Sequence, residues 1–216
     1  MAVAARRERE RTARREAILD AAQELIASEG YHSLRMDAVA DAVELSKGTL
    51  YLYFENKDAL CAAVATRLID DFIPIIERAI NAAPSGLDGI CALLQSYYDF
   101  TNDNPHHFRF ALAWLSAGER MDDSTEAFQI YRGRVGHMLS LVANTLQHGQ
   151  SDGSIRKDLD PLPQALQLWT SFLGVVLVGL NKETMAQRVP PPVNLDQLVP
   201  LQIDAVRRAL SSKGVA

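Results

Sequence analysis

Apolar residues recur at helical spacing along nearly the whole of this 216-residue chain, and no segment shows the sustained alternation of a half-buried β-strand. The first such stripe is formed by Ile18, Ala22, Leu25 and Ile26. Gly30 follows where a left-handed cap would end that helix. The pattern therefore predicts an all-α fold.

The same periodicity predicts where the helices lie. We expect them over residues 11–28, 36–43, 47–53, 57–80, 87–101, 105–117, 125–147, 162–183 and 195–211. Pro74 removes a backbone hydrogen bond inside the fourth of these helices, so we expect a kink there.

Composition excludes several classes of protein. With 48% hydrophobic residues and a net charge of −5, the chain has the composition of an average globular protein. Its longest uninterrupted apolar run, residues 172–180, is well short of the roughly 18 residues that span a bilayer. We therefore expect no membrane span, and since the N-terminus lacks the apolar run of a secretory signal, we expect a cytoplasmic protein.

The cysteines and histidines give no sign of a metal or another cofactor. Cys61 and Cys91 lie in apolar surroundings without metal-ligand spacing, which predicts buried, reduced thiols. No sequence motif of a metalloprotease, a serine hydrolase or a nucleotide-binding loop is present. We therefore expect no catalytic residues, and a protein that is not an enzyme.

Positive charge gathers at the N-terminus of this acidic chain. Residues 1–15 contain six arginines and two glutamates. Such a segment is either a solvated tail or an arm that contacts phosphates, and we expect the arm to cover residues 1–11.

The most informative segment is residues 36–57, MDAVADAVELSKGTLYLYFENK, which has the length and pattern of a helix-turn-helix. Val39, Ala40, Val43, Leu50 and Phe54 can form the inner core. The second helix presents its N-terminal N–H groups to a phosphate, and polar side chains around it can reach phosphates or base edges. The candidate DNA-binding residues are Arg35, Met36, Ser46, Lys47, Gly48, Thr49, Tyr51, Tyr53 and Lys57.

The segment VADAVELSKGTLYLYFENKDAL resembles the recognition segment of the tetracycline-repressor (TetR) family of bacterial transcriptional regulators, and ILDAAQELIASEGYHSLRMDAV before it matches as well. The resemblance covers about residues 12–64. It implies a DNA-binding domain at 1–57, a helical ligand-binding and dimerisation domain at 58–216, and a homodimer formed by the last two long helices. Two recognition helices about 34 Å apart would read an inverted repeat in double-stranded DNA.

Two positions depart from the family pattern. Glu44 stands where a turn glycine is usual, and a non-glycine residue in a left-handed turn costs on the order of 1 kcal/mol. Arg35 stands where threonine often begins the first helix of the motif. We expect it to contact phosphate but to cap the helix poorly.

The C-terminal helices supply candidates for the dimer interface. The helix at 162–183 is apolar on every side, which suits a helix between an intramolecular core and a partner subunit. The alternative is a central helix in a monomer. The candidates on the last two helices are Trp169, Leu173, Val176, Leu177, Leu180, Val199, Ile203, Val206 and Leu210.

Aromatic and apolar residues between these regions suit a pocket for a small hydrophobic or aromatic effector, although each could instead be core. Gly133 and Gly136 would mark close helix contact or the pocket wall. The candidate ligand-binding residues are Leu68, Phe72, Leu94, Tyr97, Tyr98, Phe108, Trp114, Tyr131, His137, Met138, Trp169 and Phe172.

The resulting hypothesis is a repressor that binds an inverted-repeat operator and is released by its effector, with repression taken from the family. The alternative is a helical ligand-binding or adaptor protein whose DNA-binding domain is degenerate.

Overall fold

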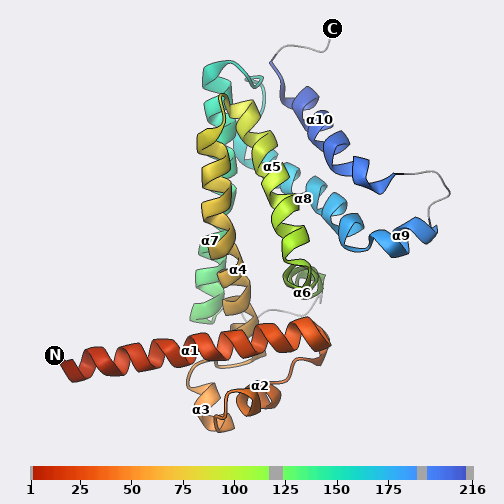
Figure 1. The fold of residues 1–216 in the computed structure, drawn as a ribbon. Helices are drawn as coiled ribbons and strands as arrows, with labels where there is room; N and C mark the ends of the chain where they lie inside the picture. The colour runs from red at the N-terminus through yellow and green to blue at the C-terminus, as the bar shows by residue number, and fades with distance from the viewer. Residues whose placement is uncertain (1, 117–123, 189–193, 213–216) are drawn as a thin grey trace. The chain divides into compact units, whose positions relative to one another are not determined.

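The computed structural model describes residues 2–116, 124–188 and 194–212. Within these ranges the chain is helical and contains no strand, apart from an isolated bridge between Ile155 and Ser211. The all-α prediction is confirmed (Figure 1). In chain order the elements are α1 (Ala2–Glu29), η1 (Tyr31–Ser33), α2 (Met36–Ala42), α3 (Lys47–Tyr51), α4 (Lys57–Ala82), α5 (Gly86–Asp103), α6 (Pro105–Ser116), α7 (Glu126–Asp152), α8 (Pro161–Leu180), α9 (Lys182–Arg188), η2 (Leu195–Gln197) and α10 (Leu198–Leu210).

The first helix is longer than its apolar stripe predicts. It begins at Ala2 rather than at residue 11, so the arginine-rich arm is part of α1. Alanine, arginine and glutamate are strong helix formers. Arg6 Nε also lies 2.7 Å from Glu10 Oε1, one helical turn further on. Their charge indicated a solvated tail or a phosphate-contacting arm but did not predict its conformation, whereas their helix propensity favours a helix.

Two C-terminal boundaries also differ from the prediction. Helix α7 continues past Gly149 to Asp152. A side chain at position 149 would collide with Ile155, since an added Cβ would lie 2.5 Å from Ile155 Cδ1. The turn comes at Gly153, where φ is 79°. The helix predicted at 162–183 ends at Leu180, and Asn181 separates it from α9, which the periodicity missed.

The chain forms two compact units. One comprises Met1–Leu68 and His106–Arg134, and the other Ile69–Pro105 and Val135–Ala216. Helices α4 and α7 each contribute to both units. This division reflects packing and does not test whether residues 1–57 fold as a domain, so that boundary stays a prediction.

The first unit packs α1, α2, α3 and the start of α4 around one apolar core. Its fully buried side chains include Ile18, Val39, Leu50 and Leu60. Helix α6 adds Phe110 and Trp114 to the same core, with Trp114 against Tyr131 of α7. Each fully buried leucine or isoleucine stabilises the fold by about 1.5–3 kcal/mol.

In the second unit α5, α8 and α10 pack on one another. Ser85 caps α5 by accepting a hydrogen bond from the Asp88 backbone N–H, and Arg207 Nη1 of α10 lies 2.8 Å from Asp88 Oδ1. Helices α5 and α7 meet at two glycines, where a Cβ on Gly86 would lie 2.3 Å from the Cα of Gly149. This approach fixes the N-terminus of α5 against the C-terminus of α7.

Gly133 and Gly136 do not mark such a contact. Both are exposed, and an added Cβ at either position meets nothing within 4 Å. The prediction that they mark close helix contact or a pocket wall was wrong, because a glycine within a helical pattern does not reveal whether a neighbour approaches it.

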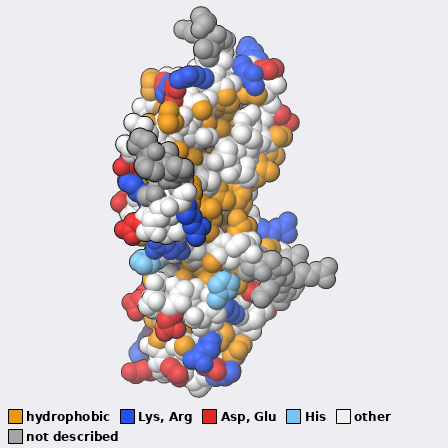
Figure 2. All heavy atoms as spheres, turned by 90° about the vertical axis from the view of Figure 1, so that its right-hand side faces the viewer, with side chains coloured by type: hydrophobic (Ala, Val, Ile, Leu, Met, Phe, Trp, Pro, Cys, Tyr) orange, Lys and Arg blue, Asp and Glu red, His pale blue; other side chains and the backbone are white. Residues whose placement is uncertain are grey.

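Among the described helices, α8 alone is long and apolar enough to cross a membrane by length and composition, and 22% of its apolar stretch is buried in the protein. One such helix is weak evidence for a span. Its exposed leucines, Leu162, Leu166 and Leu177, repeat along one side of the helix. Figure 2 shows hydrophobic side chains gathered on a face of the protein.

Candidate DNA-binding site and internal cavity

The helix-turn-helix has the predicted division into an inner and an outer side. Val39, Leu50 and Phe54 are buried, whereas Lys47 and Gly48 are exposed at the N-terminus of α3. Ser46 caps α3, since its Oγ accepts a hydrogen bond from the Thr49 backbone N–H at 3.2 Å. The exposed N-terminal turn of α3 can therefore approach an anion.

The turn between α2 and α3 is a Schellman motif. The N–H of Leu45 donates to the carbonyl of Ala40 at 2.9 Å, and the N–H of Glu44 donates to that of Asp41 at 3.1 Å. Glu44 takes the left-handed conformation with φ of 54°, and is the only described residue other than glycine with a positive φ. Glu44 thus takes the left-handed conformation of the turn glycine that it replaces, rather than a turn of different shape.

At the start of α2 the two candidate residues have different surroundings. Arg35 is exposed and extended, and its side chain makes no capping hydrogen bond, as its type predicts. The side chain of Met36 is buried in the core. Met36 can therefore contact DNA only through its backbone, and its DNA contact stays a prediction.

Lys47 is paired within the protein. Its Nζ lies 2.8 Å from Asp37 Oδ1 of α2, and both side chains are more than half exposed. The hydrogen bond from Lys47 to the Asp37 carboxylate raises the pKa of the lysine. Such an exposed pair is weak, so a DNA phosphate can compete with the carboxylate.

Lys57 also has intramolecular partners. Its Nζ donates to the Tyr31 carbonyl at 3.1 Å and lies 4.6 Å from the centroid of the Tyr31 ring. These contacts attach η1 to the start of α4 and give Lys57 a structural role. Its phosphate contact stays a prediction.

The aromatic residues of the motif differ in exposure. Tyr51 is exposed, whereas Tyr53 is half-buried and packs against the core. Leu52 between them is 79% exposed. Sequence reasoning missed Leu52 as a surface residue, because an apolar type within an apolar stretch suggests core. An exposed leucine beside α3 is suited to contact a thymine methyl group.

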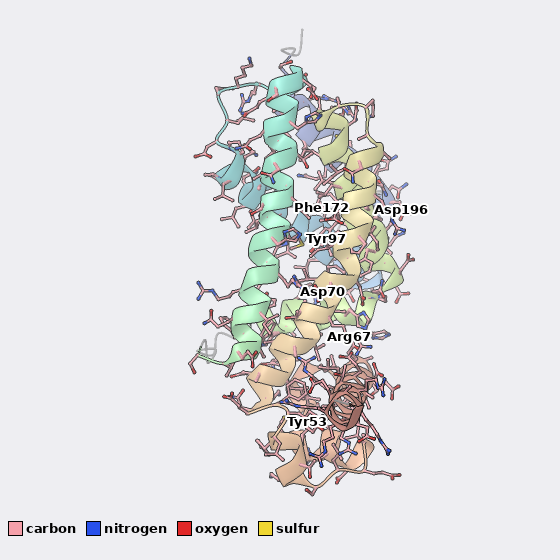
Figure 3. The ribbon with its side chains drawn as sticks, turned by 90° about the vertical axis from the view of Figure 1, so that its left-hand side faces the viewer. Tyr53, Arg67, Asp70, Tyr97, Phe172 and Asp196 are labelled. Carbon is pink, nitrogen blue, oxygen red and sulfur yellow. The ribbon has the colours of Figure 1, made fainter. Side chains whose placement is uncertain are left out.

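The second unit contains a small apolar cavity of about 40 Å³. Tyr97 of α5 and Phe172 of α8 are among its walls, with their ring centroids 5.9 Å apart (Figure 3). Burial raises the pKa of Tyr97 to about 12, and Trp169 hydrogen-bonds to its hydroxyl. The lining residues are Phe72, Ile76, Ile90, Leu93, Leu94, Tyr97, Met138, Leu139, Val142, Ala165, Leu168, Trp169 and Phe172.

Six of the predicted pocket residues thus line this cavity, and the other six do not. Leu68 and Trp114 are buried in the core of the first unit, and Tyr131 packs against that core. The remaining three are Phe108, half-buried in the first unit, Tyr98, which packs against Gly179 of α8, and His137, which is exposed. An aromatic composition indicates burial, but it does not tell a cavity wall from a packed core.

The dimer candidates divide in the same way. Leu177 is 49% exposed, and Trp169, Leu173 and Ile203 are half-buried. The exposed Leu162, Leu166 and Leu201 were missed. An all-round apolar helix has two apolar faces, and the sequence does not tell which one turns inward. Five candidates belong to the intramolecular core and are corrected: Val176, Leu180, Val199, Val206 and Leu210.

The cysteines are buried, as predicted. Burial raises the pKa of the Cys61 thiol to about 12, so the thiolate hardly forms at neutral pH. Cys61 is therefore unsuited to act as a nucleophile.

A capped, exposed helix behind a tight turn, on a core that α1, α2 and α3 share, is the arrangement of a DNA-binding helix-turn-helix. Residues 18–64 match the family model described as "Bacterial regulatory proteins, tetR family". These residues, which contain the helix-turn-helix, are therefore similar to the DNA-binding segment of TetR-family regulators.

Relatives of known name agree with this assignment. The transcriptional activator FasR of Mycolicibacterium smegmatis is 30% identical over 99 residues, which are 46% of this chain and 45% of FasR. The chain thus matches less than half the length of that relative. The fatty acid metabolism regulator protein of Bacillus subtilis is 24% identical over 143 residues, which are 66% of this chain and 71% of that protein.

Among solved structures, the regulator FadR from Bacillus subtilis in complex with stearoyl-CoA has the same fold. Its TM-score is 0.62 at 20% identity, and the match covers 93% of this chain and 99% of FadR. At this identity the likeness extends to the fold alone.

Proposed function

We propose that this protein is a cytoplasmic homodimeric repressor that binds an inverted-repeat operator and is released by a small hydrophobic molecule. The observation that carries the DNA-binding part is α3, whose capped N-terminus presents Lys47, Gly48 and Thr49 outward from a buried base. A regulator, rather than an enzyme, also agrees with the names of its relatives.

The dimer is supported by the exposed leucines of α8 and by Leu201 of α10. Exposed leucines at helical spacing form an apolar surface that a second copy of the chain would cover. A dimer supplies two recognition helices, which explains how a five-residue helix can select a site.

The effector part rests on the cavity of the second unit. Its lining is apolar, and the Trp169 indole N–H donates a hydrogen bond to the Tyr97 hydroxyl. The buried part of the effector is therefore hydrocarbon or aromatic. The stearoyl-CoA in the FadR structure carries such a chain, which supports a ligand of this class.

A cavity of about 40 Å³ is far smaller than the roughly 300–1,000 Å³ of a ligand pocket. The effector must therefore select a state in which the walls have moved apart. Phe72 and Ile76 of α4 are among these walls, and α4 starts directly after the helix-turn-helix. Its displacement would couple the effector to DNA affinity.

The test is binding of the purified protein to the DNA beside its own gene, measured by fluorescence anisotropy and footprinting at two salt concentrations. A protected inverted repeat with a steep salt dependence is the expected result. No sequence preference at low salt would favour the alternative, a helical ligand-binding or adaptor protein with a degenerate DNA-binding domain.

The effector claim needs its own test. The substitution Ala165→Leu fills the cavity, and we expect it to abolish release from the operator by a long-chain acyl-CoA while operator affinity stays unchanged. A ligand that binds the unmodified protein without altering its DNA affinity would contradict the coupling.

A further inference from the structure

The arginines of the N-terminal helix fall on two faces. Arg7, Arg11 and Arg14 lie eleven, seven and four residues before Ile18, and these spacings return to the same side of an α-helix. Ile18 is fully buried. The three arginines therefore extend the core-facing side of α1 beyond the end of the core.

The opposite face of α1 carries the other charges. Glu16 and Asp20 lie there and pair with Arg67 of α4, at 3.7 Å and 2.5 Å. Arg9 continues this face, and Arg6, at its edge, is already paired with Glu10. The arginines of the arm are thus not equivalent.

The side that carries Arg7, Arg11 and Arg14 is the side on which the helix-turn-helix lies. Helix α1 packs on α2, and its N-terminal half extends beyond α2 and α3 (Figure 1). Arg15, at the edge of the same face, lies 5.3 Å from the centroid of the Phe54 ring. The three arginines form a basic stripe, defined as Arg7, Arg11 and Arg14, on the side of α1 that packs on α2.

No described part of the chain covers this stripe. All side chains from Ala4 to Arg14 are exposed. A helical extension of this length is marginal in water without a partner. The stripe spans about 10 Å of helix at roughly 1.5 Å per residue, a length over which a DNA strand presents several phosphates.

We propose that the basic stripe of α1 binds the DNA phosphate backbone beside the site contacted by α3, as a helix laid along the duplex. This inference rests on the proposed DNA-binding function and adds to it the three residues and the face that make the contact. Arg6 and Arg9 point away from the DNA and contribute only diffuse charge. A disordered arm would instead use all of these arginines alike.

Two double variants with the same change in charge test the stripe. Arg7→Ala with Arg11→Ala removes two of its members, and Arg6→Ala with Arg9→Ala removes two arginines from the other side. Alanine keeps the helix propensity in both. Operator affinity of the full-length protein is measured by anisotropy from 0.05 to 0.3 M salt.

In the proposed homodimer the stripe variant removes four arginines, so we expect it to lower the slope of log K against log salt by about 3.6 and the affinity about 1,000-fold at 0.15 M salt. The control variant should change the slope by less than about 0.5. Equal losses in the two variants, or no loss in either, would overturn the stripe while leaving the proposed function intact. Failure of the unmodified protein to bind any operator would overturn both.

Discussion

Glu44 holds the turn of the helix-turn-helix in a conformation that its side chain disfavours. Its φ of 54° is free of cost for glycine and costs other residues about 1 kcal/mol. We expect Glu44→Gly to raise the free energy of unfolding by about 0.5–1 kcal/mol in urea titration. The greater conformational entropy of glycine in the unfolded chain offsets part of the relieved strain. Glu44→Ala keeps the disfavoured backbone. An equal gain in both variants would place the effect in the charge.

At the same scale, Asp37 competes with DNA for Lys47. Its carboxylate holds the ammonium at 2.8 Å and would itself repel a phosphate. We expect Asp37→Asn to tighten operator binding several-fold at low salt, with a smaller gain at high salt because screening weakens both effects. Asp41→Asn removes the same charge from α2 and is the matched control. If it tightens binding as much, the gain is a general charge effect.

The contact between α5 and α7 depends on the absence of a side chain. A Cβ at Gly86 would lie 2.3 Å from the backbone of Gly149. We expect Gly86→Ala to lower the free energy of unfolding by about 1–3 kcal/mol. Gly133→Ala is the same substitution in open helix, and we expect a gain of up to about 1 kcal/mol there. Similar effects of the two in urea titration would contradict the close approach.

The cap of α5 predicts a pH dependence. Hydrogen bonds from Ser85 and then Arg207 lower the pKa of Asp88. A lowered pKa means that the charged carboxylate stabilises the fold above about pH 4, and that this contribution disappears as the pH falls through the folded-state pKa. We expect Asp88→Asn to be less stable than the unmodified protein at pH 7, with a smaller difference at pH 3. Thermal melts across this range measure it, with Asp103→Asn at the other end of α5 as the control for charge. A difference that stays constant with pH would contradict this role of Asp88.

At the scale of the whole molecule, local rules predicted the elements and much less of their partners. The spacing of apolar residues located the helix-turn-helix, and the residue types at 44 and 35 predicted its left-handed turn and missing cap. Which face of α8 turns inward depends on α5 and α10, so Val176 and Leu177, neighbours in sequence, have opposite surroundings. Likewise, Gly149 resembles a helix end until the position of Ile155 is known.

The last prediction concerns the exposed side of α8, because an inverted-repeat operator needs two copies of α3. Leu166 and Leu177 are about half exposed and lie on the apolar side that we assign to the partner. We expect Leu166→Glu with Leu177→Glu to give a monomer in equilibrium sedimentation at micromolar concentration, since each would bury an unpaired charge in the interface. Loss of the dimer should also lower operator affinity, because a monomer contacts a single half-site.

The control for this variant must add two charges to α8 without entering the interface. Gln164→Glu with Gln167→Glu adds the same two charges to α8. Gln167 is exposed, and neither glutamine is one of the exposed leucines that form the apolar side. We expect the control to remain a dimer. A folded unmodified protein that sediments as a monomer would contradict the dimer itself, and the inverted repeat would then lose its physical basis, since a monomer has one recognition helix and no symmetry to match.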